Sequence, residues 1–136
     1  MWTFEYYIET KATASDIWKI LVDVENWNKW INSIEYSTLD GKFENGTIGT
    51  IKDVKGSKST FRLKNVVVNK SFIIQQKIPL CTFEGVHEII DENGSLKIKL
   101  GINMHGPLTF IFKRMTGKET ESIPIAAKKL VKLAEK

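Results

Sequence analysis

The sequence predicts an α+β fold in which a curved, seven-stranded antiparallel sheet wraps around one long C-terminal helix. Seven segments place apolar residues at nearly every second position, which is typical of half-buried strands. Two short helical stretches separate the first of these segments from the other six, and an apolar stripe with helical spacing follows the last. With 136 residues, 42% of them hydrophobic, the chain is expected to form one domain over residues 1–136.

The N-terminal region is predicted to contain one strand and two short helices. Residues 2–9 alternate between apolar and polar side chains, so they are expected to form the first strand. Thr13 and Asp16 have the spacing of a capping box, in which each side chain accepts a hydrogen bond from the backbone amide of the other residue. This box opens the first short helix, and a second short helical piece is expected over residues 23–31.

Six further strands are predicted to follow as one meander. Short turns rich in Gly, Asn and Asp separate most of them, which favours antiparallel neighbours. One face of the sheet is predicted to be apolar, with Val67 on it and with Asn65, Gln76 and His87 as isolated polar side chains, while the other face is charged. The predicted strands cover residues 33–39, 47–55, 59–68, 71–78, 82–90 and 95–104.

One long helix is predicted at the C-terminus. Pro107 follows Gly106 and suits the first position of a helix. Pro124 is expected to bend the helix without ending it, because the apolar stripe keeps its phase on both sides. About 28 residues would span roughly 40 Å, enough to cross a small sheet. The stripe consists of Leu108, Ile111, Phe112, Met115, Ile123, Ala126, Ala127, Leu130 and Ala134.

The composition argues against several classes of protein. No apolar run approaches the roughly 18–20 residues that a membrane span requires, and the N-terminus lacks the features of a secretion signal. Cys81 is the only cysteine, so no disulfide is expected and a cytoplasmic location is predicted. Because Cys81, His87 and His105 are the only Cys and His residues, a zinc site of the usual composition is not expected. No other metal and no cofactor are predicted. No phosphate loop, nucleophile elbow or metalloprotease motif occurs.

The net positive charge is concentrated in the C-terminal segment. From Lys113 onward there are seven basic and three acidic residues, whereas the preceding residues carry thirteen of each. The chain has two arginines against eighteen lysines, and arginine is the residue that contacts phosphates and base edges through two hydrogen bonds. Nucleic acid is therefore not an expected partner. A solvated helix face explains the charge, and transient contact with an anionic membrane surface is the alternative.

The predicted elements leave room for a cavity. The apolar face of a curled sheet needs a cover, and only the C-terminal helix has the length and the stripe to supply it. When a strongly curved sheet encloses a helix, side chains often leave part of the intervening space empty. The expected cavity is lined by apolar residues with isolated polar groups, which is the usual character of a small-molecule site.

Several segments, in their order along the chain, carry a resemblance to a known family. They are Ala12–Trp18 with Asp23, Trp27 and Trp30, then Leu39–Gly41 through Gly46, then His87, and Gly106–Leu108. They resemble the helix-grip fold of the START-like (SRPBCC) superfamily, and more narrowly the bacterial polyketide cyclase/dehydrase and lipid-transport family. The resemblance covers nearly the whole chain, although its motifs are structural rather than catalytic. It implies a small hydrophobic ligand, such as a lipid, polyketide or isoprenoid, between sheet and helix, with catalysis in a minority of members.

Each candidate binding residue also has a structural explanation. Trp27 and Trp30 would form the cavity rim, or else wedge the short helices onto the sheet. His87 would orient a ligand or act as an acid or base, or else be a core histidine bonded to the backbone, Gln76 or Asn65. The predicted ligand-binding residues are Trp27, Trp30, Phe61, Leu63, Phe72, Ile74, Gln76, Phe83, Gly85, His87, Leu100, Ile102, Met104, Leu108, Ile111, Phe112 and Met115.

Three functions follow from this reasoning. The first is binding or transport of a small hydrophobic ligand, by a monomer or a homodimer. Burying about 300 Å² of apolar ligand surface would contribute roughly 7 kcal/mol before ordering costs, so micromolar binding needs no charged anchor. The second is a polyketide cyclase or dehydratase in which His87 moves a proton, with no other catalytic residue predicted. The third is an interaction module with a filled core, which contacts a protein or membrane through its basic C-terminal helix.

Overall fold

The computed structural model describes residues 2–78, 80–107 and 117–136. Within these ranges the predicted elements occur in the predicted order, and the strand ends differ from the prediction by at most two residues. The elements are β1 (Trp2–Thr10), α1 (Ala14–Leu21), the 3-10 helix η1 (Val24–Lys29), β2 (Ile34–Leu39), β3 (Ile48–Asp53), β4 (Lys58–Val67), β5 (Ser71–Ile78), β6 (Cys81–Glu92), β7 (Ser95–His105) and α3 (Gly117–Ala134).

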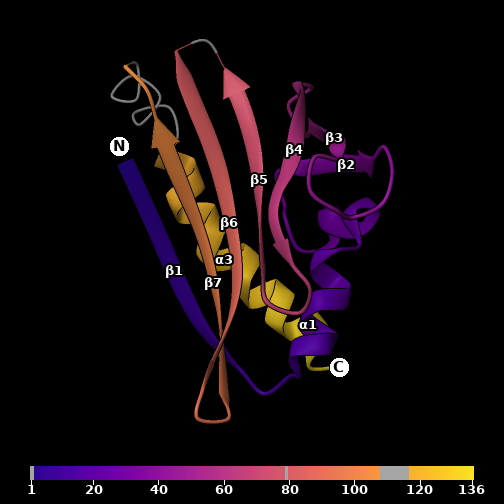
Figure 1. Ribbon diagram of the computed structural model, residues 1–136, viewed down its shortest axis with the longest axis vertical. Coiled ribbons are helices and arrows are strands. Elements are labelled where there is room, and N and C mark those ends of the chain that lie inside the picture. Colours follow the sequence, from indigo (N-terminus) through magenta and orange to yellow (C-terminus); the bar gives the residue numbers. More distant parts are fainter. Residues whose placement is uncertain (1, 79, 108–116) are drawn as a thin grey trace.

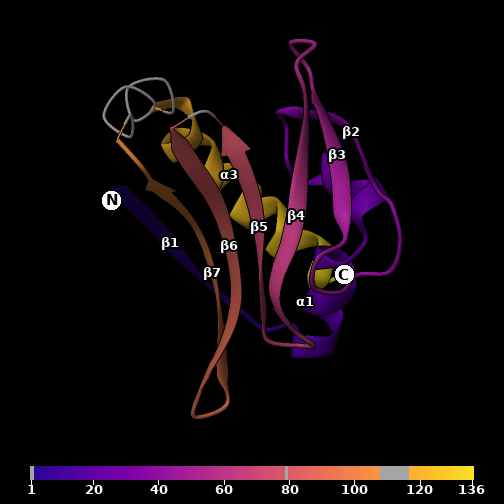
Figure 2. The ribbon, with the colours of Figure 1, turned by 45° about the horizontal axis from the view of Figure 1, so that its top comes forward.

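The strands form one antiparallel sheet in the order β1-β7-β6-β5-β4-β3-β2. Six consecutive strands pair as a meander, and β1 joins the edge that β7 would otherwise leave open. The sheet curves, and α3 lies diagonally across its concave face (Figures 1 and 2). The predicted α+β architecture, a curved seven-stranded sheet around a C-terminal helix, is therefore confirmed.

Strand alternation separates an apolar inner face from a charged outer face. Along β1 the exposed and partly buried residues alternate without a break, and β1 pairs with β7 from Trp2 opposite Met104 to Thr10 opposite Leu96. On the outer face the Lys99 ammonium lies 2.9 Å from a Glu5 carboxylate oxygen and 3.4 Å from one of Glu88. The inner face is thus free to pack against α3 and the N-terminal helices.

A β-bulge in β4 interrupts the alternation of inward and outward side chains, so the directions predicted for residues near the end of this strand are wrong. The register of β4 with β5 shifts between Lys64 and Val67, and Asn65 takes a left-handed backbone conformation with φ of 51°. The shift exposes Asn65 and Val67, which were predicted to face inward, and turns Val66 towards the core. The Val66 amide donates to Oδ1 of Asn45 at 2.8 Å, which holds the bulge. Simple alternation cannot anticipate an extra residue in a strand.

Because of this bulge, Val66 is partly buried while the adjacent Val67 is exposed. We expect Val66→Ala to lower the free energy of unfolding by about 1 kcal/mol, because partly buried methyl groups are lost. Val67→Ala should change it by less than about 0.5 kcal/mol, because Val67 is 49% exposed. Urea unfolding of the two variants measures the difference. A larger loss for Val67→Ala would show that the unshifted register holds in solution.

The N-terminal helices are fastened by side-chain hydrogen bonds. The Thr13 hydroxyl accepts from the Asp16 amide at 3.1 Å, which is the predicted helix cap of α1. The Trp27 indole Nε1 donates to the Leu21 carbonyl at 2.8 Å, which ties η1 back to the end of α1. The buried Ser37 hydroxyl donates to a carbonyl of η1 and so joins η1 to β2. The second helical piece is thus present, although as a 3-10 helix.

The C-terminal helix is confirmed over Gly117–Ala134, Pro107 is not its first residue, and the part predicted over residues 108–116 lies outside the described residues. Gly106, with φ of 123°, and Pro107 form a turn directly after β7, and α3 begins at Gly117. Pro124 lies inside α3, as predicted. At its far end, a Glu135 carboxylate oxygen accepts from the Thr10 hydroxyl at 2.9 Å and from a neighbouring backbone amide at 3.0 Å. None of the described helices is long and apolar enough to span a membrane.

Candidate ligand-binding cavity

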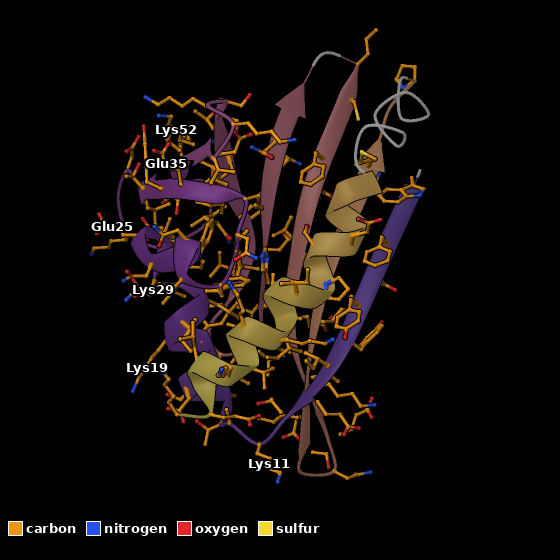
Figure 3. All side chains as sticks on the ribbon, turned by 180° about the vertical axis from the view of Figure 1, so that it is seen from behind. Lys11, Lys19, Glu25, Lys29, Glu35 and Lys52 are labelled. Atoms are coloured by element: carbon orange, nitrogen blue, oxygen red, sulfur yellow. The ribbon has the colours of Figure 1, made fainter. Side chains whose placement is uncertain are left out.

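A cavity of about 290 Å³ lies between the concave face of the sheet, α3 and the segment that joins η1 to β2. Figure 3 views the molecule from the side on which α3 covers the sheet. The cavity is lined by Trp30, Ile31, Asn32, Ser33, Ile34, Ile51, Asp53, Ser57, Ser59, Ile74, Gln76, Phe83, Gly85, Val86, His87, Leu100, Gly101, Ile102, Ser122, Ile123, Ile125 and Ala126.

The lining changes character from its buried part to its mouth. The buried lining residues are mostly apolar: Trp30, Ile34, Gly85, Leu100, Gly101, Ile102 and Ala126. The exposed lining residues, which mark the mouth, are mostly polar: Asn32, Ser33, Ser57, Ser59 and Ile125. An apolar molecule can therefore be enclosed inside while water and polar groups meet at the entrance.

Antiparallel pairing sets two neighbouring rows of residues across the inner face of the sheet where the cavity lies. In one row Gly85 of β6 lies between Ile74 of β5 and Ile102 of β7. In the next row His87 lies between Phe72 and Leu100. Residues 83, 85 and 87 of β6 share one face because alternate residues point the same way.

Glycine at position 85 leaves room for its neighbours. A Cβ atom there would lie 2.9 Å from Cγ1 of Ile74 and 3.6 Å from Cε1 of His87. Any larger side chain would have to displace Ile74 or fill the cavity. Gly85 therefore helps to keep the space open above the sheet.

His87 is an inward-facing imidazole whose Nδ1 has no hydrogen-bond partner among the described residues. Its ring stacks on Phe72, with centroids 4.3 Å apart and planes inclined by 5°. Nδ1 is fully buried and bonds to no described residue, although the side chain as a whole is only partly buried. Because His87 lines the cavity, its remaining accessible surface faces that cavity.

Burial controls the protonation of this histidine. It lowers the pKa of His87 from its ordinary 6.5 to about 4, because the imidazolium ion would lose its hydration. The carbonyl groups of Gly85 and Phe72 oppose this shift, because they favour a protonated ring. At neutral pH the imidazole is therefore uncharged, and almost no conjugate acid is present to donate a proton.

The lowered pKa predicts a specific dependence of stability on pH. Above pH 6.5 His87 is neutral in both the folded and the unfolded chain and has no effect. Between pH 6.5 and about 4 the unfolded chain binds the extra proton, so falling pH should remove up to about 3 kcal/mol of stability. Urea unfolding of wild type and His87→Phe from pH 7 to pH 4 measures this. Equal losses in both proteins would contradict the assignment to His87.

Hydrogen bonds place Gln76 and Asn32 near the mouth. Gln76 Nε2 donates to the Ser59 hydroxyl at 2.9 Å and to the Thr60 carbonyl at 3.3 Å. Asn32 Oδ1 accepts from the Lys129 ammonium, which connects α3 to the segment before β2. Neither Gln76 nor Asn65 bonds to His87, so the predicted alternative of a core histidine held by one of these amides is not observed.

The two candidate tryptophans have different positions. Trp30 belongs to the cavity wall, although only 1% of its surface is exposed, and its buried Nε1 has no partner among the described residues. Trp27 is not in the lining. It packs against Phe61 with ring centroids 5.4 Å apart, and its indole bonds to the Leu21 carbonyl. Trp27 thus follows the wedge interpretation.

The structure brings together eight of the predicted lining residues and places five others elsewhere. Trp30, Ile74, Gln76, Phe83, Gly85, His87, Leu100 and Ile102 line the cavity. Trp27, Phe61, Leu63, Phe72 and Met104 are corrected to core positions, because at most 2% of each is exposed and none borders the cavity. Leu108, Ile111, Phe112 and Met115 lie outside the described residues.

Most of the residues at the mouth were not predicted from the sequence. Asn32 and Ser33 lie in the turn between η1 and β2, where no periodic pattern indicates a direction for their side chains. Ile51 belongs to a strand whose apolar residues alternate ambiguously, with Ile48 on the outside. Ile123 and Ala126 were recognised as part of the helix stripe, and that stripe was the available signal for their place under α3. Within the described ranges, no cluster of three or more His, Cys, Asp or Glu side chains could hold a metal.

Comparisons with known proteins connect this architecture to a common fold. No family model and no curated protein matches the sequence. Three similar solved structures are the di-domain ARO/CYC StfQ from the steffimycin biosynthetic pathway, a START superfamily protein from Mycobacterium smegmatis and norcoclaurine synthase from Thalictrum flavum.

The likeness extends over nearly the whole chain. StfQ is 12% identical with a TM-score of 0.75, covering 98% of this chain and 50% of that one, so this chain spans half its length. The mycobacterial protein is 15% identical with a TM-score of 0.72, covering 96% and 97% of the two chains. Norcoclaurine synthase is 16% identical with a TM-score of 0.75, covering 99% and 87%. The chain therefore has the START-like helix-grip fold.

Proposed function

We propose that this protein binds a small hydrophobic ligand in the cavity beneath α3 and carries it without transforming it. The observation that supports this most is the cavity of about 290 Å³, which is apolar inside and polar at its mouth. The proposed unit is one ligand-binding domain over residues 1–136. The proposed ligands are of lipid, polyketide or isoprenoid type, and the proposed location is the cytoplasm, in keeping with the single unpaired cysteine.

The size of the cavity sets the size of the ligand. An apolar cavity of about 150 Å³ in a protein core accepts one benzene ring. A cavity of about 290 Å³ therefore suits two fused rings or a branched chain of similar volume. Burying such a molecule at about 25 cal/mol per Å² supports micromolar binding after ordering costs.

The chemistry of the lining favours binding over catalysis. Among the described lining residues only Asp53 and His87 are ionisable in the ordinary pH range. Asp53 Oδ1 accepts from the Lys55 and Ser57 amides, at 2.9 and 3.0 Å, within its own turn. His87 is neutral, and Asp53 is the one other titratable group among the described lining residues. The cyclase or dehydratase alternative would have to depend on His87 alone.

The third alternative required a filled core beneath the helix. The cavity beside Ile123 and Ala126 argues against that condition. The lysines of α3 at positions 128, 129 and 132 are exposed, and a transient membrane contact through them would be compatible with a carrier.

Calorimetric titration with naphthalene tests the proposal, since naphthalene has two fused rings and no polar group. We expect saturable binding of one molecule per chain with a dissociation constant in the micromolar range. Protein purified from cells should also retain a small molecule in native mass spectrometry. The absence of saturable binding together with an empty protein from cells would contradict the proposal.

A further inference from the structure

We propose that the ligand of this cavity is a carboxylic acid, whose apolar body lies beneath α3 and whose carboxylate binds Lys129 and Asn32 at the mouth. This inference rests on the proposed function, because it concerns the ligand of the same cavity. It follows from the hydrogen bond between these two side chains, from their place beside the mouth and from the distribution of charge around it.

Lys129 reaches the mouth of the cavity from α3. Its ammonium donates to Oδ1 of Asn32, which is one of the exposed residues that line the mouth. Lys129 also follows Ile125, the exposed lining residue of α3, by four positions, so the two side chains are neighbours on one face of the helix. Two separate observations therefore place this ammonium beside the mouth, although Lys129 is not one of the lining residues.

The pair formed by Asn32 and Lys129 offers hydrogen-bond donors to a ligand. An ammonium cannot accept a hydrogen bond, so the bond between the two residues requires the oxygen of the Asn32 amide to face Lys129 and leaves Nδ2 as the free end. Neither side chain makes another hydrogen bond to a described residue. The ammonium uses one of its three N–H groups on Asn32, and the amide keeps both of its own. A carboxylate, which only accepts, has two oxygens for these donors.

The lining behind the mouth suits the apolar body of such a ligand but not its charge. The buried lining residues are mostly apolar, and no Lys or Arg is among the described residues that line the cavity. A carboxylate placed deep inside would lose its hydration without a cation in return. At the mouth it keeps part of its hydration and gains the attraction of Lys129. The apolar body therefore lies inside, and the charged end lies at the mouth.

The charges at the mouth favour an anion with a single negative charge. Asp53 also lines the cavity, and the backbone amides of Lys55 and Ser57 hold its carboxylate in the turn between β3 and β4. Among the described residues, Lys129 is the one cationic side chain bonded to a lining residue. This positive charge is opposed by Asp53, so the mouth does not balance a phosphate monoester, which carries about two negative charges. A carboxylate carries only one.

The test compares 2-naphthoate with 2-naphthamide, which has a similar shape and no charge, in wild type and Lys129→Met. Calorimetric titration gives the ratio of their dissociation constants, and comparing this ratio between proteins cancels the difference in hydration of the probes. We expect the preference for 2-naphthoate to fall about fivefold in Lys129→Met, because methionine keeps an apolar stem and loses the charge. Lys129→Arg should keep most of the preference.

Lys19→Met is the matched control, because it removes the same charge from a helix without touching the cavity. Lys19 is exposed on α1, and Figure 3 shows it pointing outwards, away from α3. This variant should leave the preference unchanged. An equal fall in both variants would show a general effect of net charge and would overturn the site at Lys129. An unchanged ratio in Lys129→Met would overturn it as well.

Two measurements without this variant cover the case in which Lys129→Met does not fold. Between about 0.01 M and about 1 M salt the screening length falls from about 30 Å to about 3 Å, so the preference of wild type for 2-naphthoate should fall over this range. Asp53→Asn should raise the preference about twofold at low salt, because it removes the opposing charge. A preference that responds to neither change would contradict a carboxylate at this mouth.

Further results distinguish a failure of this inference from a failure of the proposed function. If 2-naphthamide binds wild type at least as tightly as 2-naphthoate, the carboxylate class is wrong. If 2-naphthyl phosphate binds more tightly than 2-naphthoate, the single charge is wrong. In both cases saturable binding of naphthalene would leave the proposed function intact. If neither naphthalene nor any of these probes binds, the proposed function itself fails.

Discussion

Replacing Phe72 with alanine is expected to lower the free energy of unfolding by about 3–5 kcal/mol. Phe72 is 1% exposed and contacts three rings, with centroid distances of 4.9 Å to Phe43, 5.9 Å to Trp18 and 4.3 Å to His87. Its removal would leave a void where the N-terminal helix, the loop after β2 and the wall of the cavity meet. Total stabilities of about 5–15 kcal/mol make this a large fraction of the whole.

Urea unfolding of Phe72→Ala measures the effect, and Tyr7→Ala provides the control. Tyr7 is also an aromatic residue on a strand, but half of its surface is exposed on the outer face. The control should lose less than about 1 kcal/mol. A loss for Phe72→Ala no larger than that of Tyr7→Ala would contradict the packing described here. In the fraction that still folds, binding of naphthalene should weaken, because the support behind His87 is gone.

Replacing Ala126 with phenylalanine is expected to reduce naphthalene affinity by about 100-fold. Ala126 lies on α3, is 9% exposed and borders the cavity. A phenyl ring at this position would occupy space that the ligand needs. Excluding about 110 Å² of apolar contact costs about 2.7 kcal/mol, which corresponds to that factor.

Lys128→Phe adds the same ring to an exposed position of the same helix. Calorimetric titration of both variants should show the loss of affinity only in Ala126→Phe. Unfolding curves of both variants establish that each is folded. Undiminished binding in a folded Ala126→Phe protein would mean that naphthalene binds somewhere other than beneath α3.

The fold was predictable because its strongest signals are local. Alternation over nine residues of β1 and turn residues between the later strands define strands without reference to the rest of the chain. The bulge at Asn65 was not predictable, because it depends on a hydrogen bond from the Val66 amide to Asn45, twenty-one residues away. Pro107 was predicted to open the last helix but lies in a turn, since a proline suits a turn as well as a helix start.

The cavity was predictable in its location but only partly in its lining. Strand parity assigned an inward direction correctly to Ile74, His87 and Ile102. It could not show that Phe61 and Leu63, which also face inward, pack against the N-terminal helices and do not border the cavity. An inward-facing residue borders the cavity only where the nearest helix lies far enough from the sheet. That distance cannot be predicted from the sequence of any single strand.

A crystal of the protein soaked with 2-bromonaphthalene shows whether a ligand enters the cavity beneath α3, because the anomalous signal of bromine locates the bound molecule without interpretation of weak density. We expect a bromine peak in the space bordered by Ile74, Leu100 and Ala126. Two results would contradict a binding site beneath α3. One is an interior filled by the protein's own side chains with no bromine peak, and the other is a peak found only on the outer face of the sheet.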